Sequence, residues 1–247
     1  MSIFKRKVKD KFNTEVPKIV IGTKSRAADS YYRLKDNVIY YSDNGKNKVF
    51  QIESSIAGEG KSTVIVNLAV SLAKSNKKVL ILDLDFRRPK VHRVFGVPNF
   101  NGLAEYMLGE CGKEDLIKRT EYGVDIINRG KSAHNASIIF TSDKFKALID
   151  ECKEKYDYVL FDCPPVLMVS DYIHIAKLSD AIIFVVCSGI TRRSQLSEAV
   201  ELLHRADANI FGTVLTFRKN AKIGPRYSKY YYGRYYQKIQ NRYLSED

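Results

Sequence analysis

The chain has 247 residues, 45% of them hydrophobic, and a formal net charge of +13 at pH 7. This length suits one large α/β domain or two small ones, and it is enough to bury a sizeable core. No stretch approaches the roughly 18 consecutive apolar residues of a membrane-spanning helix. The four scattered cysteines favour a reduced, cytoplasmic chain without a zinc site or a disulfide framework.

The positive charge is concentrated at the two ends of the chain. Residues 1–26 and 217–247 each carry eight Lys or Arg against two acids, whereas the stretch between them is nearly neutral. A nucleic-acid-binding domain usually carries a basic face on the fold itself, so this distribution argues against nucleic acid as a partner. Basic ends suit an anionic membrane surface, an acidic partner or regulation by added negative charge. Solvated tails that aid solubility are the simpler alternative.

Segments rich in β-branched residues and Leu alternate with helical patterns along the chain. In order, we expect a helix near 26–38, a strand over Lys48–Glu53, a helix over 61–75, a strand over Lys78–Phe86, helices over 102–108 and 113–118, a strand over Val124–Asn128, a helix over 141–155, a strand over Tyr156–Asp162, a helix over 170–178, a strand over Asp180–Val186, a helix over 192–206 and a strand over Ile210–Phe217. Several strands are nearly continuous apolar runs, which is typical of strands buried on both faces of a parallel sheet. The alternation predicts an α/β fold, a doubly wound and mainly parallel sheet with helices on both faces.

The predicted domain organisation follows from this alternation and from the basic ends. A basic segment occupies residues 1–24, the α/β domain residues 25–217, and a flexible basic tail residues 218–247. The tail is expected to be flexible because its sequence has no apolar periodicity.

The sequence GEGKST, preceded by SSIA, nearly matches the phosphate-binding loop pattern G-x-x-x-x-G-K-[ST], with Ser55 in place of the first Gly. It follows a predicted strand and opens a predicted helix, the setting in which backbone N–H groups hold phosphates. There Gly58 and Gly60 permit close backbone approach, Lys61 reaches the β/γ-phosphates and Ser62 ligates Mg²⁺. Ser55 costs little unless its position needs a positive φ. A plain strand-to-helix turn is the alternative. The expected nucleotide-binding residues are Ala57, Gly58, Glu59, Gly60, Lys61, Ser62, Thr63 and Arg87.

Three aspartates are expected at one edge of the sheet. The sequence ILDLDFRRP places Asp83 and Asp85 two residues apart, hence on the same face of a strand, and Asp162 closes the strand YVLFD. Ligands of open α/β sheets bind at the carboxyl ends of the strands. A single aspartate there can be a helix N-cap or a turn residue. Three beside a phosphate-binding loop indicate phosphoryl transfer supported by Mg²⁺.

The C-terminal sequence RYSKYYYGRYYQKIQNRY mixes tyrosines with cations. Tyrosines of a core strand would be accompanied by Val, Leu or Ile. Stacking on single-stranded nucleic acid is one interpretation, but phosphate acceptors fit the charge better. Each phosphate adds about −1.5 to −2 at neutral pH, so several would turn a basic tail strongly negative. The candidate acceptors are Tyr227, Tyr230, Tyr231, Tyr232, Tyr235, Tyr236 and Tyr243.

Together, GEGKST, the D-x-D-x-R run from Asp83, the Asp162-x-Pro-Pro turn and the tyrosine cluster resemble bacterial tyrosine kinases of the capsule and exopolysaccharide type. The resemblance implies a P-loop fold, use of ATP with Mg²⁺, and autophosphorylation of the tyrosines between subunits of a homo-oligomer. It also implies a membrane-embedded activator that controls polysaccharide chain length. The kinase would be cytoplasmic and peripheral at the inner face of the plasma membrane.

The resemblance also assigns the catalytic residues. Lys61 would neutralise the phosphates, and Asp85 and Asp162 would join Ser62 in supporting Mg²⁺. Asp83 would orient the incoming phenol or accept its proton.

The chain departs from the family in places. The ring-forming E-x-x-R-x-x-R segment reads Asp29, Tyr32 and Lys35 here, which leaves the oligomer size open, and Leu-Asn near the base reads Leu215-Thr216. Two alternatives compete with the kinase. Partitioning and cell-division ATPases carry a second lysine where this chain has Ile56, and the aspartates argue against a module that only holds nucleotide.

Overall fold

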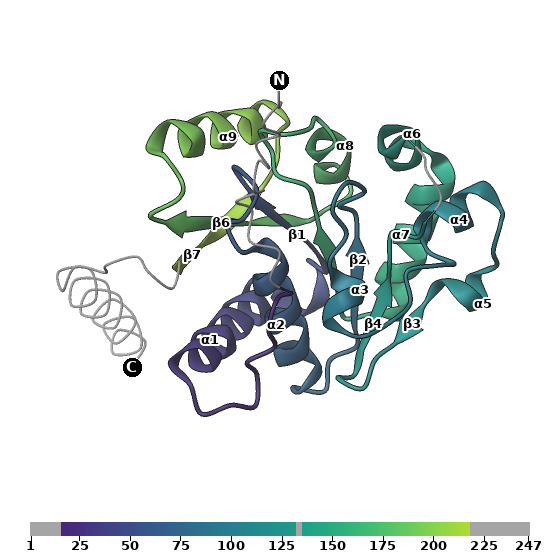
Figure 1. Ribbon diagram of the computed structural model, residues 1–247, viewed down its shortest axis with the longest axis horizontal. Coiled ribbons are helices and arrows are strands. Elements are labelled where there is room, and N and C mark those ends of the chain that lie inside the picture. The colour runs from purple at the N-terminus through teal and green to yellow at the C-terminus, as the bar shows by residue number, and fades with distance from the viewer. Residues whose placement is uncertain (1–15, 132–134, 218–247) are drawn as a thin grey trace, which may run out of the picture. The chain divides into compact units, whose positions relative to one another are not determined.

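The computed structural model of the chain describes residues 16–131 and 135–217 (Figure 1). Within them, no helix is both long enough and apolar enough to cross a lipid bilayer. The tyrosine cluster and most of the basic N-terminal segment lie outside these residues, so the domain boundaries at 24/25 and 217/218 stay predictions. The elements are α1 (Arg26–Tyr41), η1 (Asp43–Gly45), β1 (Val49–Ser54), α2 (Lys61–Ala73), β2 (Val79–Asp83), α3 (Val91–Val94), α4 (Leu103–Leu108), α5 (Lys113–Leu116), β3 (Lys118–Arg119), β4 (Val124–Ile127), α6 (Ala136–Thr141), α7 (Asp143–Lys155), β5 (Tyr158–Asp162), α8 (Tyr172–Ala176), β6 (Ala181–Ser188), α9 (Arg193–Arg205) and β7 (Ile210–Phe217).

The strands of the described residues form one sheet in the order β3-β4-β2-β5-β1-β6-β7. The central strands run parallel: β2 pairs with β4 and β5, and β1 pairs with β5 and β6. The two-residue strand β3 pairs antiparallel with β4 at one edge. The sheet is mainly parallel, which confirms the predicted fold class.

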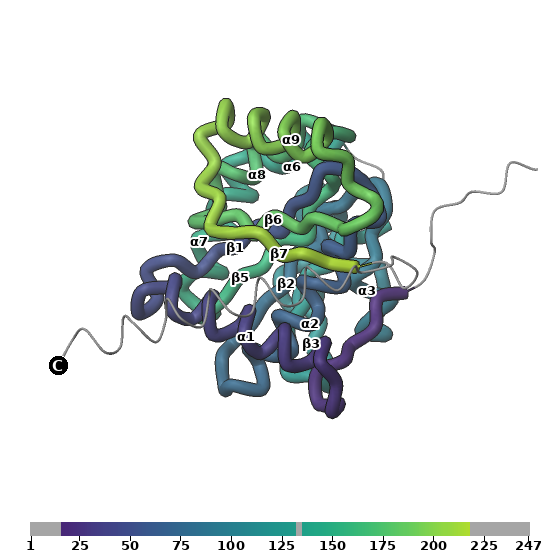
Figure 2. The backbone as a smooth tube through the Cα atoms, turned by 90° about the vertical axis from the view of Figure 1, so that its left-hand side faces the viewer, coloured from purple at the N-terminus to yellow at the C-terminus, as the bar shows by residue number. Residues whose placement is uncertain are grey.

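Both faces of the sheet are covered. Every residue of β1, β2 and β5 is buried. Along β2, Val79 and Ile81 pack with α1 and α2, whereas Leu80 and Leu82 pack with α7 on the other face. Figure 2 shows α1 and α2 on one side of the sheet and α6, α8 and α9 on the other. A strand between two apolar layers favours apolar residues on both of its faces, which explains the continuous runs of β2 and β5 in the sequence.

Four short elements are not predicted from the sequence: η1, α3, β3 and α6. They have two to six residues, too few to display a hydrophobic period. Local hydrogen bonds set their ends instead. The Asn135 side chain caps α6 by accepting from the Ser137 N–H at 3.1 Å. Ser142 Oγ accepts from Phe145 N–H at 3.2 Å, so α7 begins after Ser142 rather than at residue 141 as predicted.

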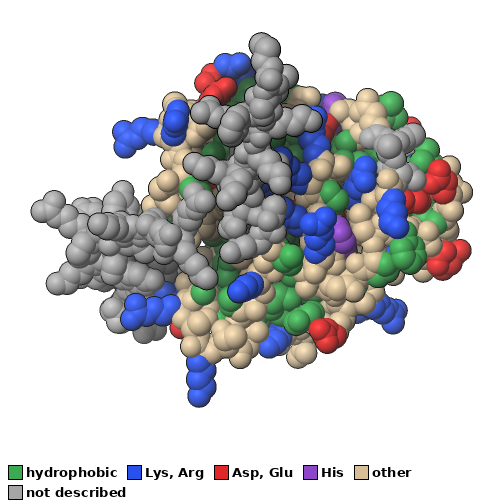
Figure 3. Space-filling model, in the orientation of Figure 1, with side chains coloured by type: hydrophobic (Ala, Val, Ile, Leu, Met, Phe, Trp, Pro, Cys, Tyr) green, Lys and Arg blue, Asp and Glu red, His purple; other side chains and the backbone are tan. Residues whose placement is uncertain are grey.

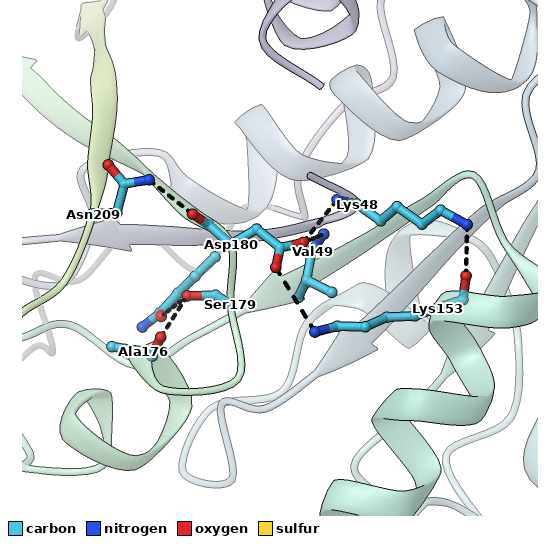
Figure 4. Close-up of polar contacts among 8 residues, drawn as sticks. Lys48, Val49, Lys153, Ala176, Ser179, Asp180 and Asn209 are labelled. Atoms are coloured by element: carbon cyan, nitrogen blue, oxygen red, sulfur yellow. Dashed lines mark hydrogen bonds and ion pairs between the residues drawn. The ribbon is translucent and has the colours of Figure 1, made fainter. Parts of the chain in front are cut away.

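An aspartate fixes the end of the sheet where β1 begins (Figure 4). Asp180 Oδ2 accepts from the backbone N–H groups of Lys48 and Val49 at 2.7 and 2.8 Å. Its other oxygen lies 3.7 Å from Lys153 Nζ, and its carbonyl accepts from the Asn209 side chain at 2.9 Å. These bonds join α7 and the start of β7 to β1, the strand that leads into the phosphate-binding loop.

Candidate active site

The glycine loop lies between β1 and α2, as predicted. Gly58 and Gly60 have φ angles of +89° and +100°, which favour glycine. A Cβ added at Gly60 would also lie 3.3 Å from the Thr216 methyl. Ser55 is not among the residues with positive φ. The one deviation from the phosphate-binding pattern therefore falls where a side chain costs no backbone strain.

Hydrogen bonds of the buried residue Glu59 stabilise the conformation of this loop. Its carboxylate is buried, accepts from the Ile56 N–H at 2.7 Å, and is hydrogen-bonded to the Thr191 hydroxyl. Thr216 Oγ1 donates to the Glu59 carbonyl at 2.7 Å. The Glu59 side chain joins the loop to the turn after β6, and its backbone carbonyl joins the loop to β7. The prediction that Glu59 belongs to the nucleotide-binding loop stays a prediction.

Lys61 is the first residue of α2, and its side chain is buried. Its Nζ donates to Ser54 Oγ at 2.9 Å. The next residue, Ser62, donates its hydroxyl to Asp162 Oδ2 at 2.9 Å. The start of the helix therefore presents a cation and a hydroxyl to the carboxyl end of the sheet. A helix N-terminus there also favours anions.

Two of the three predicted aspartates lie opposite each other. Asp83 closes β2, Asp162 closes β5, and the two residues are directly paired in the parallel register. Asp83 Oδ2 accepts from the backbone N–H groups of Lys90 and Val91 at 3.1 and 3.2 Å. Both carboxyls are almost completely buried, and within the described residues Oδ1 of each has no hydrogen-bond partner.

The third aspartate is not part of the strand. The strand predicted over Lys78–Phe86 ends at Asp83, and Asp85 lies in the turn that follows. Its Oδ1 accepts from the backbone N–H groups of Arg87 and Arg88 at 3.2 and 2.9 Å. These bonds reverse the chain, so Asp85 is half-buried and the Arg87 side chain is exposed. The prediction that Asp83 and Asp85 share a strand face is therefore wrong.

Burial and neighbouring charges raise the pKa values of Asp83 and Asp162. Burial, followed by the charges of Asp162 and Asp85, raises the pKa of Asp83 well above its ordinary value. Burial raises the pKa of Asp162 to about 6, although Lys61 opposes the rise. Both groups are thus destabilised as anions in the free protein.

Sequence reasoning missed Glu53, the penultimate residue of β1. It is fully buried, its Oε1 accepts from Gln51 Nε2 at 2.7 Å, and its Oε2 has no partner among the described residues. Burial raises the pKa of Glu53 to about 8, against an opposing effect of Lys61. The signal was an acid in a strand expected to be buried, directly before the loop.

We expect Glu53 to make the ligand-free protein less stable at high pH. A raised acid pKa means that the folded protein binds the proton more tightly than the unfolded chain. Stability is therefore fully present below the unfolded pKa and is lost as the pH rises toward 8. Glu53→Gln should flatten this loss between pH 5.5 and 8. One pKa unit is worth about 1.4 kcal/mol, and 1 kcal/mol moves Tm by about 2–4 °C in a domain of this size, so the two Tm profiles should diverge by several degrees.

Thermal unfolding without nucleotide or metal measures this effect. Glu198→Gln, which removes an exposed carboxyl of α9, is the matched control and should follow the wild-type profile. Parallel profiles for wild type and Glu53→Gln would contradict a raised pKa at this position.

The site fits a divalent cation of the Mg²⁺ type. Such ions take carboxylate and hydroxyl oxygens and are usually bound through one or two carboxylates together with substrate phosphates. Asp83 and Asp162 each offer a buried oxygen without a partner among the described residues, and Ser62 and Asp85 lie beside them. A cation would compensate the adjacent carboxylates, which otherwise repel each other.

Comparisons with known proteins were made for the whole chain. A family model described as "AAA domain" matches residues 47–210. The tyrosine-protein kinase YwqD of Bacillus subtilis (strain 168) is 33% identical over 212 residues, which cover 85% of this chain and 88% of YwqD. The chain spans only 26% of the tyrosine-protein kinase Etk of Escherichia coli (strain K12), at 30% identity.

Solved structures of a bacterial tyrosine kinase domain and of a related ATPase resemble this fold. The kinase domain of Escherichia coli ETK has a TM-score of 0.77 at 28% identity, covering 85% of this chain and 84% of that domain. The septum site-determining protein MinD of Pyrococcus horikoshii, complexed with Mg-ADP, has a TM-score of 0.61 at 27% identity, covering 74% of this chain and 76% of MinD.

The fold, the glycine loop and the aspartates at the sheet edge define a P-loop nucleotide-binding domain. Within that class, the chain belongs to the bacterial tyrosine-protein kinases, as its similarity to YwqD over most of both sequences establishes. The predicted family and enzyme class are thereby confirmed. The fold also fits MinD-like ATPases, but the kinases are the better match in both identity and superposition.

Proposed function

We propose that the protein transfers the γ-phosphoryl group of ATP to tyrosines of the C-terminal cluster on a neighbouring copy. The observation that carries this proposal is the direct pairing of Asp83 with Asp162 beside the loop of Lys61. That pairing places acidic oxygens next to a buried ammonium and a helix N-terminus, the groups that phosphoryl transfer needs.

Each group has a role in binding. Backbone N–H groups of the loop from Ala57 to Thr63 would hold the phosphates, and Lys61 would leave Ser54 to neutralise the β/γ-phosphates. Ser62, Asp85 and Asp162 would hold Mg²⁺. When bound, the ion would supply positive charge that offsets the negative charge developing in the transition state.

Asp83 would orient the tyrosine that accepts the phosphoryl group and would receive its phenol proton. In the reaction, the bond from the γ-phosphorus to the β–γ bridging oxygen breaks, a bond to the phenol oxygen forms, and ADP leaves. Because a tyrosine phenol titrates near ~10, its proton would pass to Asp83 late, as the new bond forms. The Oδ1 of Asp83 that lacks a partner among the described residues supports this role.

Membership of the family suggests where the kinase acts in the cell and what it regulates. We propose that a membrane-embedded activator recruits the kinase to the inner face of the membrane and that phosphorylation regulates capsule or exopolysaccharide synthesis. The basic ends of the chain would assist, since each Lys or Arg near an anionic leaflet contributes about 1 kcal/mol of attraction.

A mixing experiment tests the transfer between subunits. Full-length Lys61→Met protein is combined with a chain truncated after Asn220, in Mg-ATP and the cytoplasmic segment of the activator, and phosphate is located by intact-mass analysis. We expect phosphate on the full-length variant, because the truncated partner has an intact site and the variant an intact tail. Each protein alone is the control and should stay unmodified. If the variant stays unlabelled while wild type labels normally, transfer takes place within one chain.

A further inference from the structure

Two segments beside Asp83 and Asp162 are rich in cations. One follows β2 with the sequence RRPKVHR, and the other follows β4 with the sequence NRGK. Four of their Lys and Arg side chains are exposed, and Lys90 and Arg129 are half-buried. We call these cations the basic rim: Arg87, Arg88, Lys90, Arg93, Arg129 and Lys131. Figure 3 shows Lys and Arg side chains gathered on this face around α3, with Asp and Glu mainly toward the margin.

Hydrogen bonds hold the second segment of the rim against Pro98 and Asn99, which follow α3. The Asn99 side chain donates to the Gly130 carbonyl at 3.0 Å and accepts from the Gly130 N–H at 3.2 Å. The Asn128 side chain donates to the Pro98 carbonyl at 2.6 Å. The Arg129 guanidinium lies over the Phe86 ring, 5.6 Å from its centroid. The rim is therefore built into the fold.

The rim adjoins the acceptor side of the site. The N–H groups of Lys90 and Val91 donate to Asp83, the residue proposed to receive the phenol. The opposite side of the glycine loop is occupied by Glu59 with its partners from β7 and the turn after β6. A tyrosine that reaches Asp83 therefore lies beside the rim.

Part of the basic rim has no ion pair with a carboxylate of the described residues. Among the described residues, no carboxylate forms an ion pair with Arg87, Arg93, Arg129 or Lys131. In the same part of the chain, the buried Nε of Arg129 has no hydrogen-bond acceptor. A buried donor without a partner is costly, and an anionic ligand would supply the acceptor.

We propose that the basic rim binds phosphotyrosines already formed on the tail, so that one phosphate promotes the next. This inference rests on the proposed function. The unmodified tail is basic, with eight Lys or Arg against two acids over residues 217–247, and the rim repels it. Each phosphate adds about −1.5 to −2 and offers acceptors that Arg binds through two parallel hydrogen bonds. The rim thus weakens binding of an unmodified tail and strengthens binding of a partly modified one.

Peptide binding tests the rim independently of catalysis. The probe is a synthetic peptide of residues 226–236, either unmodified or phosphorylated at its three consecutive tyrosines, titrated by fluorescence anisotropy into full-length Lys61→Met protein. We expect the phosphorylated form to bind about tenfold tighter or better. Arg93→Gln combined with Lys131→Gln in that background should weaken its binding about tenfold, because charge-assisted hydrogen bonds to phosphate are lost.

The matched control is Lys74→Gln with Arg205→Gln, which removes two exposed cations at the ends of α2 and α9. It should change phosphopeptide binding less than about twofold. Equal binding of the two peptides, or equal losses in the two double variants, would overturn the proposal. So would loss of binding to anionic lipid vesicles in the rim variant with unchanged phosphopeptide binding, since the rim would then serve a membrane surface.

The order of modification gives a second readout. In an otherwise wild-type chain, Arg93→Gln/Lys131→Gln should add the first phosphate at least as fast as wild type, because repulsion is reduced. It should then accumulate chains with one or two phosphates where wild type proceeds to many. Uniform slowing of every step would contradict the proposal. If wild type gains no phosphate at all, the proposed kinase function fails, while the peptide titration still decides what the rim binds.

Discussion

Replacing Lys61 with Met is expected to abolish tyrosine phosphorylation and to leave the domain folded. Within the described part of the chain the Lys61 ammonium donates to Ser54 Oγ, so the loss of folding free energy should be modest, about 1 kcal/mol. Its main role is to meet charge that develops on the phosphates. Removing one such stabilising group typically costs about 10²–10³-fold in rate.

Two measurements separate the effects of Lys61→Met. Phosphate incorporation by intact mass reports transfer, and thermal unfolding reports the fold. Lys74→Met at the far end of α2 replaces an exposed lysine and should behave as wild type in both. A Lys61→Met protein that keeps more than about a tenth of the wild-type rate would contradict the role proposed for Lys61 in neutralising the phosphates.

Asp83→Asn and Asp85→Asn should damage different steps. Asn keeps an acceptor for the backbone N–H groups that each aspartate holds, so the local structure should survive in both variants. Asp83→Asn is expected to slow transfer by about 10²-fold or more, the scale of a lost general base, and to leave ATP affinity within about threefold. Asp85→Asn should weaken Mg²⁺-dependent ATP binding as well as transfer.

The thermal stability of Asp83→Asn gives a second test of the environment of Asp83. Because burial disfavours the charged form of Asp83, a neutral amide of the same shape should leave Tm unchanged or raise it. Fluorescent-nucleotide titrations with and without Mg²⁺, run beside phosphorylation rates, distinguish the two variants. If both lose affinity to the same extent, the roles assigned to the two aspartates are incorrect.

The sequence was sufficient for the fold class because burial on both faces leaves a strong signal. The run of β2 is apolar up to its last residue, Asp83, and the helices α2, α7 and α9, with 13 residues each, are long enough to show a period. The hydrophobic pattern does not predict α3 and β3. Elements of two to four residues take their shape from hydrogen bonds, such as those between Asp83 and the start of α3, and these depend on tertiary neighbours.

The sequence indicated which residues belong to the candidate site, but it did not indicate how they are arranged. The glycine pattern located the loop because positive φ angles at Gly58 and Gly60 require that residue type. The aspartates were found, but a period of two cannot show that the chain turns at Asp85, and it cannot show the register that pairs Asp83 with Asp162. Glu53 was missed because one acid in a strand carries no motif, and only its buried position beside Lys61 gives it meaning.

The complete burial of Asp83 has a consequence for how the enzyme uses its nucleotide. A kinase whose general base stood open to solvent would activate water and hydrolyse ATP to no purpose. Here the carboxyl is sealed, with 0% of its surface exposed and one oxygen held by the backbone of Lys90 and Val91. For the proposed role of Asp83 as base, a group must displace this cover before it can reach the carboxyl. Discrimination between phenol and water would then depend on access to the carboxyl more than on its reactivity, and ATP would be conserved until a tyrosine arrives.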